Sequence, residues 1–346
     1  MSGMAHEAGP GGPGGGPPPS PERFFETAHG IYRSYAMKAA LELDLFTAIA
    51  GGASDVDAIA GRCGASRRGT RILCDYFTII GFLTKQDGRY ACAPDAALFL
   101  NRQSPAWLGS AIEFLLAPHH IDAISRLPET VRTGHADTST LEPDHPIWVT
   151  FARAMAPMLA MPARMMAEAI GVAGAGPMTV LDIAAGHGLW GISVAQLNPQ
   201  AEIVGADWGP VLEVAKENAA KAGVAGRYRT ITGSAFTADL GTGYDLVLVP
   251  NFLHHFDEPT CTQFLQRVRG TLKDGGRVVV CEFVPNDDRV TPPMAAAFSM
   301  TMLINTPAGD AYTFAQLQTM LTDAGFRDIN LQRLPVPTST VITARR

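Results

Sequence analysis

The sequence predicts an α/β protein: a Rossmann-like, seven-stranded, doubly wound sheet preceded by a mostly helical winged-helix domain. The first observation is the short apolar run Met178–Ile183, which is followed by small residues at 184–188 and by helical spacing from Leu189. The second is the alternation of strand-like and helix-like segments up to the C-terminus, typical of a parallel sheet covered on both faces. The third is the order helix, short helix, longer helix and hairpin before residue 93.

Length and composition limit the classes of protein that this chain can be. A chain of 346 residues is long for one domain, and 47% hydrophobic residues are enough for sizeable cores. The net charge of −6 argues against a nucleic-acid partner, which would require a basic face. There is no membrane-length apolar run and no secretory signal, so we expect a cytoplasmic protein without a membrane partner. The five scattered cysteines suit reduced thiols and lack metal-ligand spacing.

The chain divides into four predicted parts. Residues 1–22 are rich in Gly and Pro and cannot bury much apolar area, so we expect a disordered tail. Residues 23–100 form the winged-helix domain and residues 101–172 a helical linker. Residues 173–346 form the sheet domain, which begins after a glycine-rich joint at 171–176.

The N-terminal domain is predicted from helical spacing and turn signals. Apolar residues keep helical spacing up to Ile49, with a break at 42–44. Ser54 is in position to cap a short helix at 55–62, and a longer helix is expected at 67–80. Residues 83–92 indicate a hairpin that turns at Asp87 and Gly88. This order of elements is that of a winged helix.

A winged helix raises the hypothesis of DNA binding. Arg67, Arg68 and Arg71 open the candidate recognition helix, as a DNA reader would require. The alternative is the solvated start of a helix in a dimerisation domain. We favour pairing of two chains, because the helical segment before residue 50 is longer and more apolar than one small domain needs and the whole chain is acidic.

Residues 101–172 are predicted to contain helices at 108–116, 121–133 and 147–170, with breaks at Pro118, Pro143 and Pro146. A methionine stripe runs along the last helix. Core packing explains most such stripes, but methionine also provides an adaptable lining for a flat apolar ligand. Within this region and beyond it we assign five residues to a substrate pocket: His120, Met155, Met158, His255 and Met302.

In the second half, strands are predicted at 178–183, 201–207, 227–231, 244–249 and 277–282, with helices from 189, at 211–222, 260–272 and 313–324. Residues 326–331 and 338–344 are predicted to form a closing antiparallel pair. In a doubly wound sheet, ligands bind at the carboxyl ends of the strands. The ends of four strands carry Asp182, Asp207, the segment that starts at Asn251, and Glu282.

The turn after residue 183 matches G-x-G-x-x-G from Gly186 to Gly191, which alone is a weak dinucleotide signal. A pyrophosphate would be repelled by Asp182, whereas a ligand with a cationic end and a ribose suits an acid there. Asp207 follows at about the spacing at which an acid holds ribose hydroxyls. The pattern Asp182-x-Ala184-x-Gly186-x-Gly188 resembles the first motif of class I S-adenosylmethionine (SAM) methyltransferases, with Ala184 at a usual glycine. A structural turn without a ligand is the remaining alternative.

Two longer motifs make the resemblance more specific. The block Asn251-Phe-Leu-His-His-Phe-Asp-Glu-Pro-Thr-Cys261 and the block Leu272-Lys-Asp-Gly-Gly-Arg-Val-Val-Val-Cys-Glu282 resemble plant-type small-molecule O-methyltransferases, the caffeate and acetylserotonin group, and their bacterial secondary-metabolite relatives. Leu45-Phe46 and Gly81-Phe-Leu resemble the family's N-terminal dimerisation module. The resemblance spans about residues 24–346. It implies SAM as cofactor, S-adenosylhomocysteine as product, a small-molecule substrate and a homodimer.

Position by position, the resemblance implies that His254 is the catalytic base and that Glu282 steadies it. Phe256 falls on an aromatic beside the adenine. The other cofactor residues it implies, together with those at the strand ends, are Asp182, Ala184, Gly186, Gly188, Asp207, Trp208, Gly233, Ser234, Ala235, Phe236 and Asn251. Ser234 and His255 stand where the family often has aspartates, Pro250 where a lysine is common, and Ala311, next to Asp310, where a second acid is usual.

The chemistry of methyl transfer also favours a histidine. A phenol with a pKa near 10 is mostly protonated at neutral pH, and an imidazole with a pKa near 6.5 can take its proton. A helix-start histidine bonded to backbone is the structural alternative. A metal-assisted alternative would join His254 and His255 to His119, His120 or a carboxylate, as in relatives that methylate carbon beside a keto acid. We expect no metal, and keep C- or N-methylation and a ligand-sensing winged-helix regulator as alternatives.

Overall fold

The computed structural model describes residues 19–136, 145–336 and 338–346. The predicted tail up to residue 18 and the predicted break at Pro143 therefore lie outside the described residues. The chain separates into two compact units, residues 1–93 and 94–346. Within the described ranges, no helix combines the length and the apolar character needed to cross a membrane.

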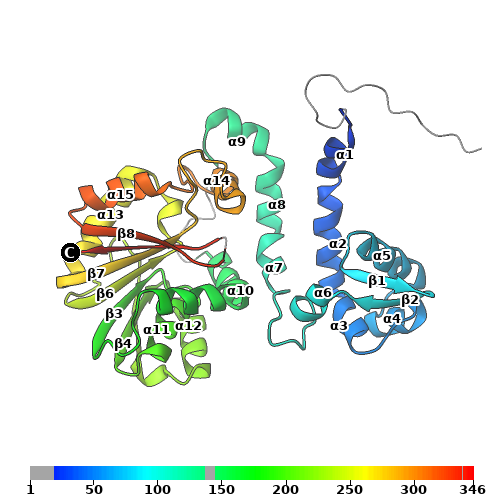
Figure 1. The fold of residues 1–346 in the computed structure, drawn as a ribbon, viewed down its shortest axis with the longest axis horizontal. Helices are drawn as coiled ribbons and strands as arrows, with labels where there is room; N and C mark the ends of the chain where they lie inside the picture. Colours follow the sequence, from blue (N-terminus) through cyan, green and yellow to red (C-terminus); the bar gives the residue numbers. More distant parts are fainter. Residues whose placement is uncertain (1–18, 137–144, 337) are drawn as a thin grey trace, which may run out of the picture. The chain divides into compact units, whose positions relative to one another are not determined.

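The first unit is helical with one hairpin, as expected for a winged helix (Figure 1). Its core contains the Phe46 and Phe77 rings, whose centroids lie 5.1 Å apart. The predicted helix break is present, with Asp44 in the left-handed region at φ 52°. The elements are α1 (Glu22–Ala28), α2 (Gly30–Glu42), α3 (Leu45–Ala50), α4 (Val56–Cys63), α5 (Arg67–Ile79), β1 (Leu83–Gln86) and β2 (Arg89–Cys92).

The predicted cap of α4 is wrong by one residue. Asp55 occupies the N-cap position, and its side chain accepts a hydrogen bond from the backbone N–H of Ala58 at 2.9 Å. Ser54 instead accepts a hydrogen bond from the guanidinium of Arg89, in β2. A serine and an aspartate are both good N-caps, so the sequence alone could not rank two adjacent candidates.

The second unit begins with α6 (Pro94–Phe99), α7 (Ala111–Leu115), α8 (Pro118–Ser125), α9 (Leu127–Thr133) and α10 (Ile147–Ala169). The single helix predicted for residues 121–133 is two helices. Pro128 stands in the first turn of α9, where its missing N–H costs nothing, but it could not continue the hydrogen-bond ladder of α8. Pro118 likewise starts α8, rather than only ending the helix before it.

The sheet of the second unit is seven-stranded, as predicted, in the order β5-β4-β3-β6-β7-β9-β8. All neighbouring strands are parallel except for the pairs that β9 forms with β7 and β8. The strands are β3 (Met178–Ile183), β4 (Ala201–Asp207), β5 (Tyr228–Thr232), β6 (Tyr244–Pro250), β7 (Leu272–Glu282), β8 (Arg327–Arg333) and β9 (Thr340–Arg345).

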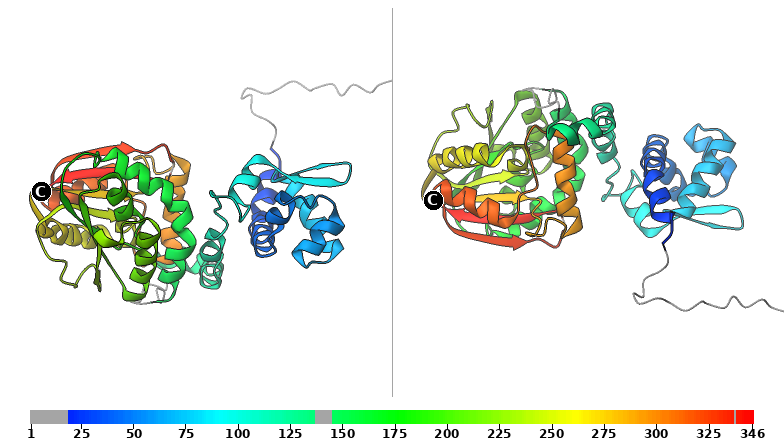
Figure 2. Two further views of the ribbon diagram at one scale, coloured as in Figure 1. Left: turned by 90° about the horizontal axis from the view of Figure 1, so that it is seen from below. Right: turned by 90° about the horizontal axis from the view of Figure 1, so that it is seen from above.

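Helices cover both faces of this sheet (Figures 1 and 2). On one face lie α11 (Leu189–Leu197) and α12 (Gly209–Lys221), with α10 packed on them; on the other lie α13 (Glu258–Thr271) and α15 (Phe314–Asp323). Alternate residues of β3 serve the two cores: Val180 belongs to the core that includes Trp190 of α11, and Leu181 to the core that includes Phe264 of α13. This two-sided burial explains the continuous apolar run of β3.

Two helices were not predicted: the short α6 and a longer helix after β7. Residues 284–312 include α14 (Pro293–Asn305), which packs against α8 and α9. Its sequence, PMAAAFSMTMLIN, is apolar on most of its circumference, so it shows little of the amphipathic period from which a helix is recognised. Two short turns, η2 (Ala225–Arg227) and η3 (Leu253–His255), complete the unit, and η3 carries both histidines of the predicted site.

Candidate active site

The predicted site residues lie at or just after the carboxyl ends of neighbouring strands. Asp182, Asp207 and Glu282 stand in β3, β4 and β7, and Asn251 directly follows β6. The strand order places β3 between β4 and β6, and β7 beside β6. The four carboxyl ends therefore converge, as the parallel arrangement requires.

The loop after β3 is held in left-handed backbone. Ala184, Gly186 and Gly188 have φ values of 52°, 57° and 76°. At Gly188 a Cβ atom would lie 2.9 Å from both the Cβ of Ala215 and the hydroxyl of Tyr228, so this position is closed to any side chain. At Gly186 the nearest atom would be 3.8 Å away. Gly188 thus serves packing, whereas the backbone at Gly186 is open to a ligand.

The carboxylate of Asp207 is tied to this loop. One oxygen accepts a hydrogen bond from the N–H of Gly186 at 2.8 Å, and the other from the N–H of Trp208 at 2.7 Å. Burial raises the pKa of Asp207 to about 6. The residue remains partly exposed, so an ionised Asp207 can still accept hydrogen bonds from the hydroxyls of a bound ligand.

Asp182, by contrast, lies beneath the loop and is completely buried. Its Oδ2 accepts a hydrogen bond from the N–H of Gly191, in the first turn of α11, at 2.9 Å. Burial raises the pKa of Asp182 well above its usual value. Among the described residues, its Oδ1 and the hydroxyl of Tyr228 are buried without a hydrogen-bond partner. The side chain thus holds the start of α11 from below the loop.

The loop after β5 is lined by aromatic rings. Gly233 has a φ of 140°, and its N–H donates to the carbonyl of Asp207. The rings of Phe236 and Phe256 meet edge to face with centroids 5.0 Å apart, and both remain partly exposed. Asp207, Trp208 and Asn251 therefore lie at the same end of the sheet as the predicted adenine-side residues, which are Gly233, Ser234, Ala235, Phe236 and Phe256.

His254 forms a buried pair with Glu282. Its Nδ1 lies 2.5 Å from Oε2 of Glu282. The other oxygen of Glu282 accepts hydrogen bonds from the N–H groups of Phe252 and Leu253, each at 2.9 Å. A carboxylate can only accept, so Nδ1 carries a proton and the lone pair of a neutral His254 is at Nε2. The geometry fits a general base.

Aromatic residues that the sequence analysis did not assign surround the two histidines. Phe298 of α14 lies 4.9 Å from the ring of His254 and stacks on Phe283 at 3.8 Å. On the other side, Trp148 meets His255 edge to face at 5.8 Å. Burial lowers the pKa of His255 well below its usual value, and its Nδ1 has no partner among the described residues. The helical pair Trp148 and Phe151 could have been noticed in α10, but Phe298 stands in α14, which was not predicted.

The loop after α14 packs directly on the backbone of His254. A Cβ atom at Gly309 would overlap the carbonyl oxygen of His254 and lie 3.0 Å from the carbonyl carbon of His255. Ala311 is fully buried, and the neighbouring Asp310 pairs with Arg289 at 2.9 Å. The carboxylate of Asp310 thus meets Arg289, and Ala311 has no acid to offer.

The predicted substrate residues lie on three helices. Met155 and Met302 are buried. Met155 stands one helical turn after Phe151 in α10, and Met302 stands one turn after Phe298 in α14. His120 is half-buried in α8, and its Nδ1 lies 2.8 Å from the carbonyl oxygen of Phe114. Met158 is 38% exposed. For metal binding, no cluster of three or more His, Cys, Asp or Glu side chains suited to an ion occurs within residues 19–136, 145–336 and 338–346.

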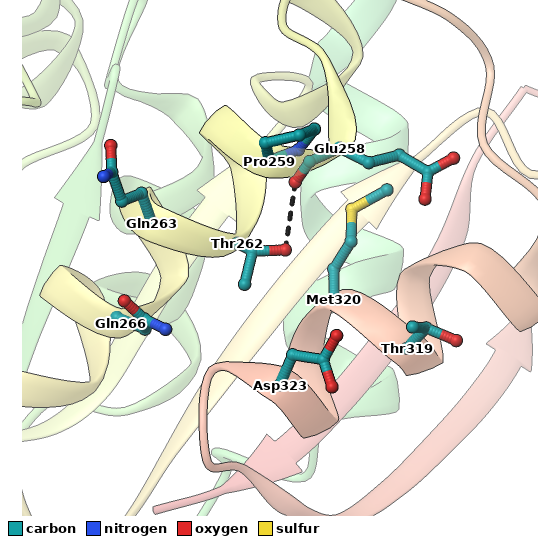
Figure 3. Close-up of a pocket in the computed structure, with 8 residues that line it drawn as sticks. All are labelled: Glu258, Pro259, Thr262, Gln263, Gln266, Thr319, Met320 and Asp323. Atoms are coloured by element: carbon teal, nitrogen blue, oxygen red, sulfur yellow. Dashed lines mark hydrogen bonds between the residues drawn. The ribbon is translucent and has the colours of Figure 1, made fainter.

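A separate groove of about 480 Å³ lies between α13 and α15 (Figure 3). Glu258, Thr262 and Asp323 give it polar walls, and the hydroxyl of Thr262 donates to the backbone carbonyl of Glu258. None of the predicted site residues lines it. It therefore plays no part in the site described above.

Two family models of O-methyltransferases match this chain. The family described as an O-methyltransferase domain matches residues 137–327, and the O-methyltransferase dimerisation domain matches residues 25–102. A 3-hydroxy-5-methyl-1-naphthoate 3-O-methyltransferase of Streptomyces sahachiroi is 30% identical over 96% of this chain and 98% of its own length.

Several solved structures share the fold of this chain. A putative O-methyltransferase from Nostoc punctiforme is 52% identical, with a TM-score of 0.91 over 95% of this chain and 99% of that one. Human N-acetylserotonin methyltransferase in complex with SAM is 23% identical, with a TM-score of 0.84 over 96% of this chain and 99% of that one.

Proposed function

This chain belongs to the O-methyltransferase family and is a SAM-dependent enzyme, and from that premise we propose that it methylates an aromatic hydroxyl of a secondary metabolite with His254 as general base. The observation that carries the proposal is the buried pair of His254 and Glu282, which fixes the imidazole with its free lone pair at Nε2. The other assignments depend on the residues gathered around this pair.

We assign cofactor binding to the loop after β3 and to the ends of β4 and β5. The open backbone at Gly186 allows close approach, and Asp207 can accept hydrogen bonds from ribose hydroxyls. Phe236 and Phe256 offer apolar surface to an adenine ring. Asp182 and Gly188 support the loop from below. These features fit SAM, which supplies an electrophilic methyl group when it is bound.

The task of the protein is then to position the acceptor and to take its proton. In the proposed reaction, the acceptor oxygen forms a bond to the methyl carbon as the bond from that carbon to sulfur breaks. The proton of the hydroxyl passes to Nε2 of His254. Glu282 stabilises the resulting imidazolium through its contact with Nδ1.

The walls around His254 support an aromatic acceptor. Phe298 and Trp148 face the two histidines from α14 and α10, and flat rings pack well against such faces. The naphthoate methyltransferase relative acts, by its name, on a hydroxylated aromatic ring. We therefore propose a phenol or naphthol rather than an aliphatic alcohol.

We also propose that the protein is a homodimer that pairs through its N-terminal domain and does not read DNA. The dimerisation-domain match and the exposed rings of Phe24, Phe25 and Tyr32 support pairing. Two arginines of the candidate recognition helix are engaged with acids: Arg67 with Asp57 and Arg71 with Asp75. A cytoplasmic location remains an expectation, supported by the five free thiols.

The experiment that tests the function is a screen of phenols and naphthols with methyl-labelled SAM, read by mass spectrometry and product NMR. A labelled methyl ether is the expected product. A labelled methyl group on carbon or nitrogen would show that the enzyme is a C- or N-methyltransferase instead. Binding of SAM without transfer to any acceptor would favour a ligand-sensing protein.

A further inference from the structure

We propose that His119 and His120 form a binding site for a carboxylate on the methyl acceptor; this inference depends on the proposed function, because the acceptor occupies the space beside His254. The two histidines stand in the first turn of α8, which packs against α14, the helix that carries Phe298. Their rings lie 4.2 Å apart with an angle of 49° between the planes.

A continuous series of rings connects this pair to the catalytic histidine. His120 contacts Phe114 at 4.6 Å, and Phe114 contacts Phe151 at 5.0 Å. The series continues from Phe151 to Trp148, with ring centroids 6.3 Å apart, and from Trp148 to His255, 5.8 Å apart. It ends with His255 and His254, whose centroids lie 4.4 Å apart. Most of these rings are partly exposed, whereas His254 is buried. An aromatic acceptor that lies along them would bring its hydroxyl to one end and another substituent to the other.

The hydrogen bonds of His120 define what it can offer. Its Nδ1 lies 2.8 Å from the carbonyl oxygen of Phe114, which can only accept, so Nδ1 carries a proton. When the ring is neutral, Nε2 has the lone pair; when it is cationic, Nε2 becomes a charged donor. A carboxylate prefers the charged donor.

The surroundings of the pair favour the uncharged form of both histidines. Burial lowers the pKa of both histidines, and His120 and His145 lower that of His119 further. The acid nearest along α8, Asp122, pairs with Arg126 at 2.9 Å. A carboxylate would favour the cationic form and so bring a proton with it. Two imidazoles that share one added proton match a monoanion better than a phosphate dianion, which usually meets arginine or lysine.

The test compares 6-hydroxy-2-naphthoate with its uncharged methyl ester, measured by calorimetry at pH 7 with S-adenosylhomocysteine present. We expect the acid to bind about tenfold or more tightly than the ester, the usual worth of a charge-assisted hydrogen bond. Its binding heat should vary with the ionisation enthalpy of the buffer, because protons are taken up, and that of the ester should not.

The matched variant is His119→Gln with His120→Asn. Asparagine retains a donor near the position of Nδ1, so the bond to Phe114 can survive while the Nε2 position is lost. This double variant should bind acid and ester within about threefold of each other. It should also lose the proton uptake. His135→Gln, an exposed histidine outside the pair, is the control and should preserve the preference of the wild type.

Equal binding of acid and ester by the wild type, no binding of either, or a preference that persists in the double variant would overturn the inference. Failure of the proposed function has a different signature. If the wild type and the double variant methylate the ester at similar rates, O-methylation stands whatever the carboxylate result. If no methyl ether forms from any phenol, the function fails even where the acid binds better.

Discussion

The carboxylate of Glu282 holds both the ring of His254 and the backbone that leads to it. Oε2 contacts Nδ1 of His254 at 2.5 Å, while Oε1 accepts from the N–H groups of Phe252 and Leu253. Because β7 and β6 are neighbours in the sheet, one side chain at the end of β7 fixes the short turn η3 that follows β6. The orientation of the imidazole is thus set by the sheet rather than by the loop.

Glu282→Gln should therefore damage the proton transfer more than cofactor binding. With its oxygen held by the two backbone N–H groups, the glutamine would point its amide N–H₂ at Nδ1. The histidine would then have to carry its proton on Nε2 and could not act as a base. We expect kcat to fall by about 10²–10⁴-fold. SAM affinity, measured by calorimetry, should change less than about threefold. An unchanged kcat would show that Glu282 does not control the tautomer.

Gly309→Ala tests the contact on the other side of His254. The added Cβ would overlap the carbonyl oxygen of His254, so either the loop or η3 must move. We expect a loss of kcat of about tenfold or more, since displacements near 1 Å at a reacting group are costly.

The matched control for that variant is Gly270→Ala. Gly270 lies in α13 with nothing within 4 Å of its added Cβ. This change should leave kcat unaffected and raise the free energy of unfolding by up to about 1 kcal/mol. Equal activity in the two variants would mean that the loop at 309 does not position the histidine.

Asp207 should make SAM affinity dependent on pH. Burial raises its pKa to about 6, so the carboxyl group becomes protonated below that pH and loses acceptor capacity for ribose hydroxyls. SAM affinity should be highest above pH 6 and fall as the pH is lowered through it. Asp207→Asn should bind weakly throughout, with a flatter profile between pH 5 and 7. A wild-type affinity that is constant over this range would contradict the assignment.

The parts of the site that follow a local pattern could be predicted from the sequence. The strand at Met178–Ile183 is apolar because both faces are buried, and the turn after it needs residues that tolerate positive φ. His254 lies just beyond β6 and Glu282 is the last residue of β7, so the contact between them follows from the neighbouring positions of these two strands.

The other walls of the site depend on packing between distant segments. Gly309 approaches His254 from about 55 residues away, and nothing near Gly309 in the sequence signals that contact. Phe298 belongs to α14, whose largely apolar sequence hides its helical period. Asp182 was expected to meet a ligand because of its position at a strand end. Its burial depends on the packing of α11, where the N–H of Gly191 donates to its carboxylate.

The proposed dimer should be sensitive to charge on α2. Ile31 and Tyr32 are 59% and 63% exposed, and the proposed pairing with a second chain would bury them. Sedimentation should give a dimer for the wild type and a lower association constant for Ile31→Glu with Tyr32→Glu. Thr84→Glu, on the exposed hairpin, should sediment as the wild type. A wild-type monomer that binds duplex DNA with a steep salt dependence would instead favour the regulator.

The central claim is that His254 removes the proton of the acceptor hydroxyl, and single-turnover transfer from methyl-labelled SAM to a phenol tests it most directly. His254→Ala should bind SAM as tightly as the wild type and transfer the label about 10²–10⁴-fold more slowly. His255→Ala should lose less, because its ring does not contact Glu282. Transfer by His254→Ala at the wild-type rate would contradict the claim, as would loss of wild-type activity on chelation that is restored by iron or zinc.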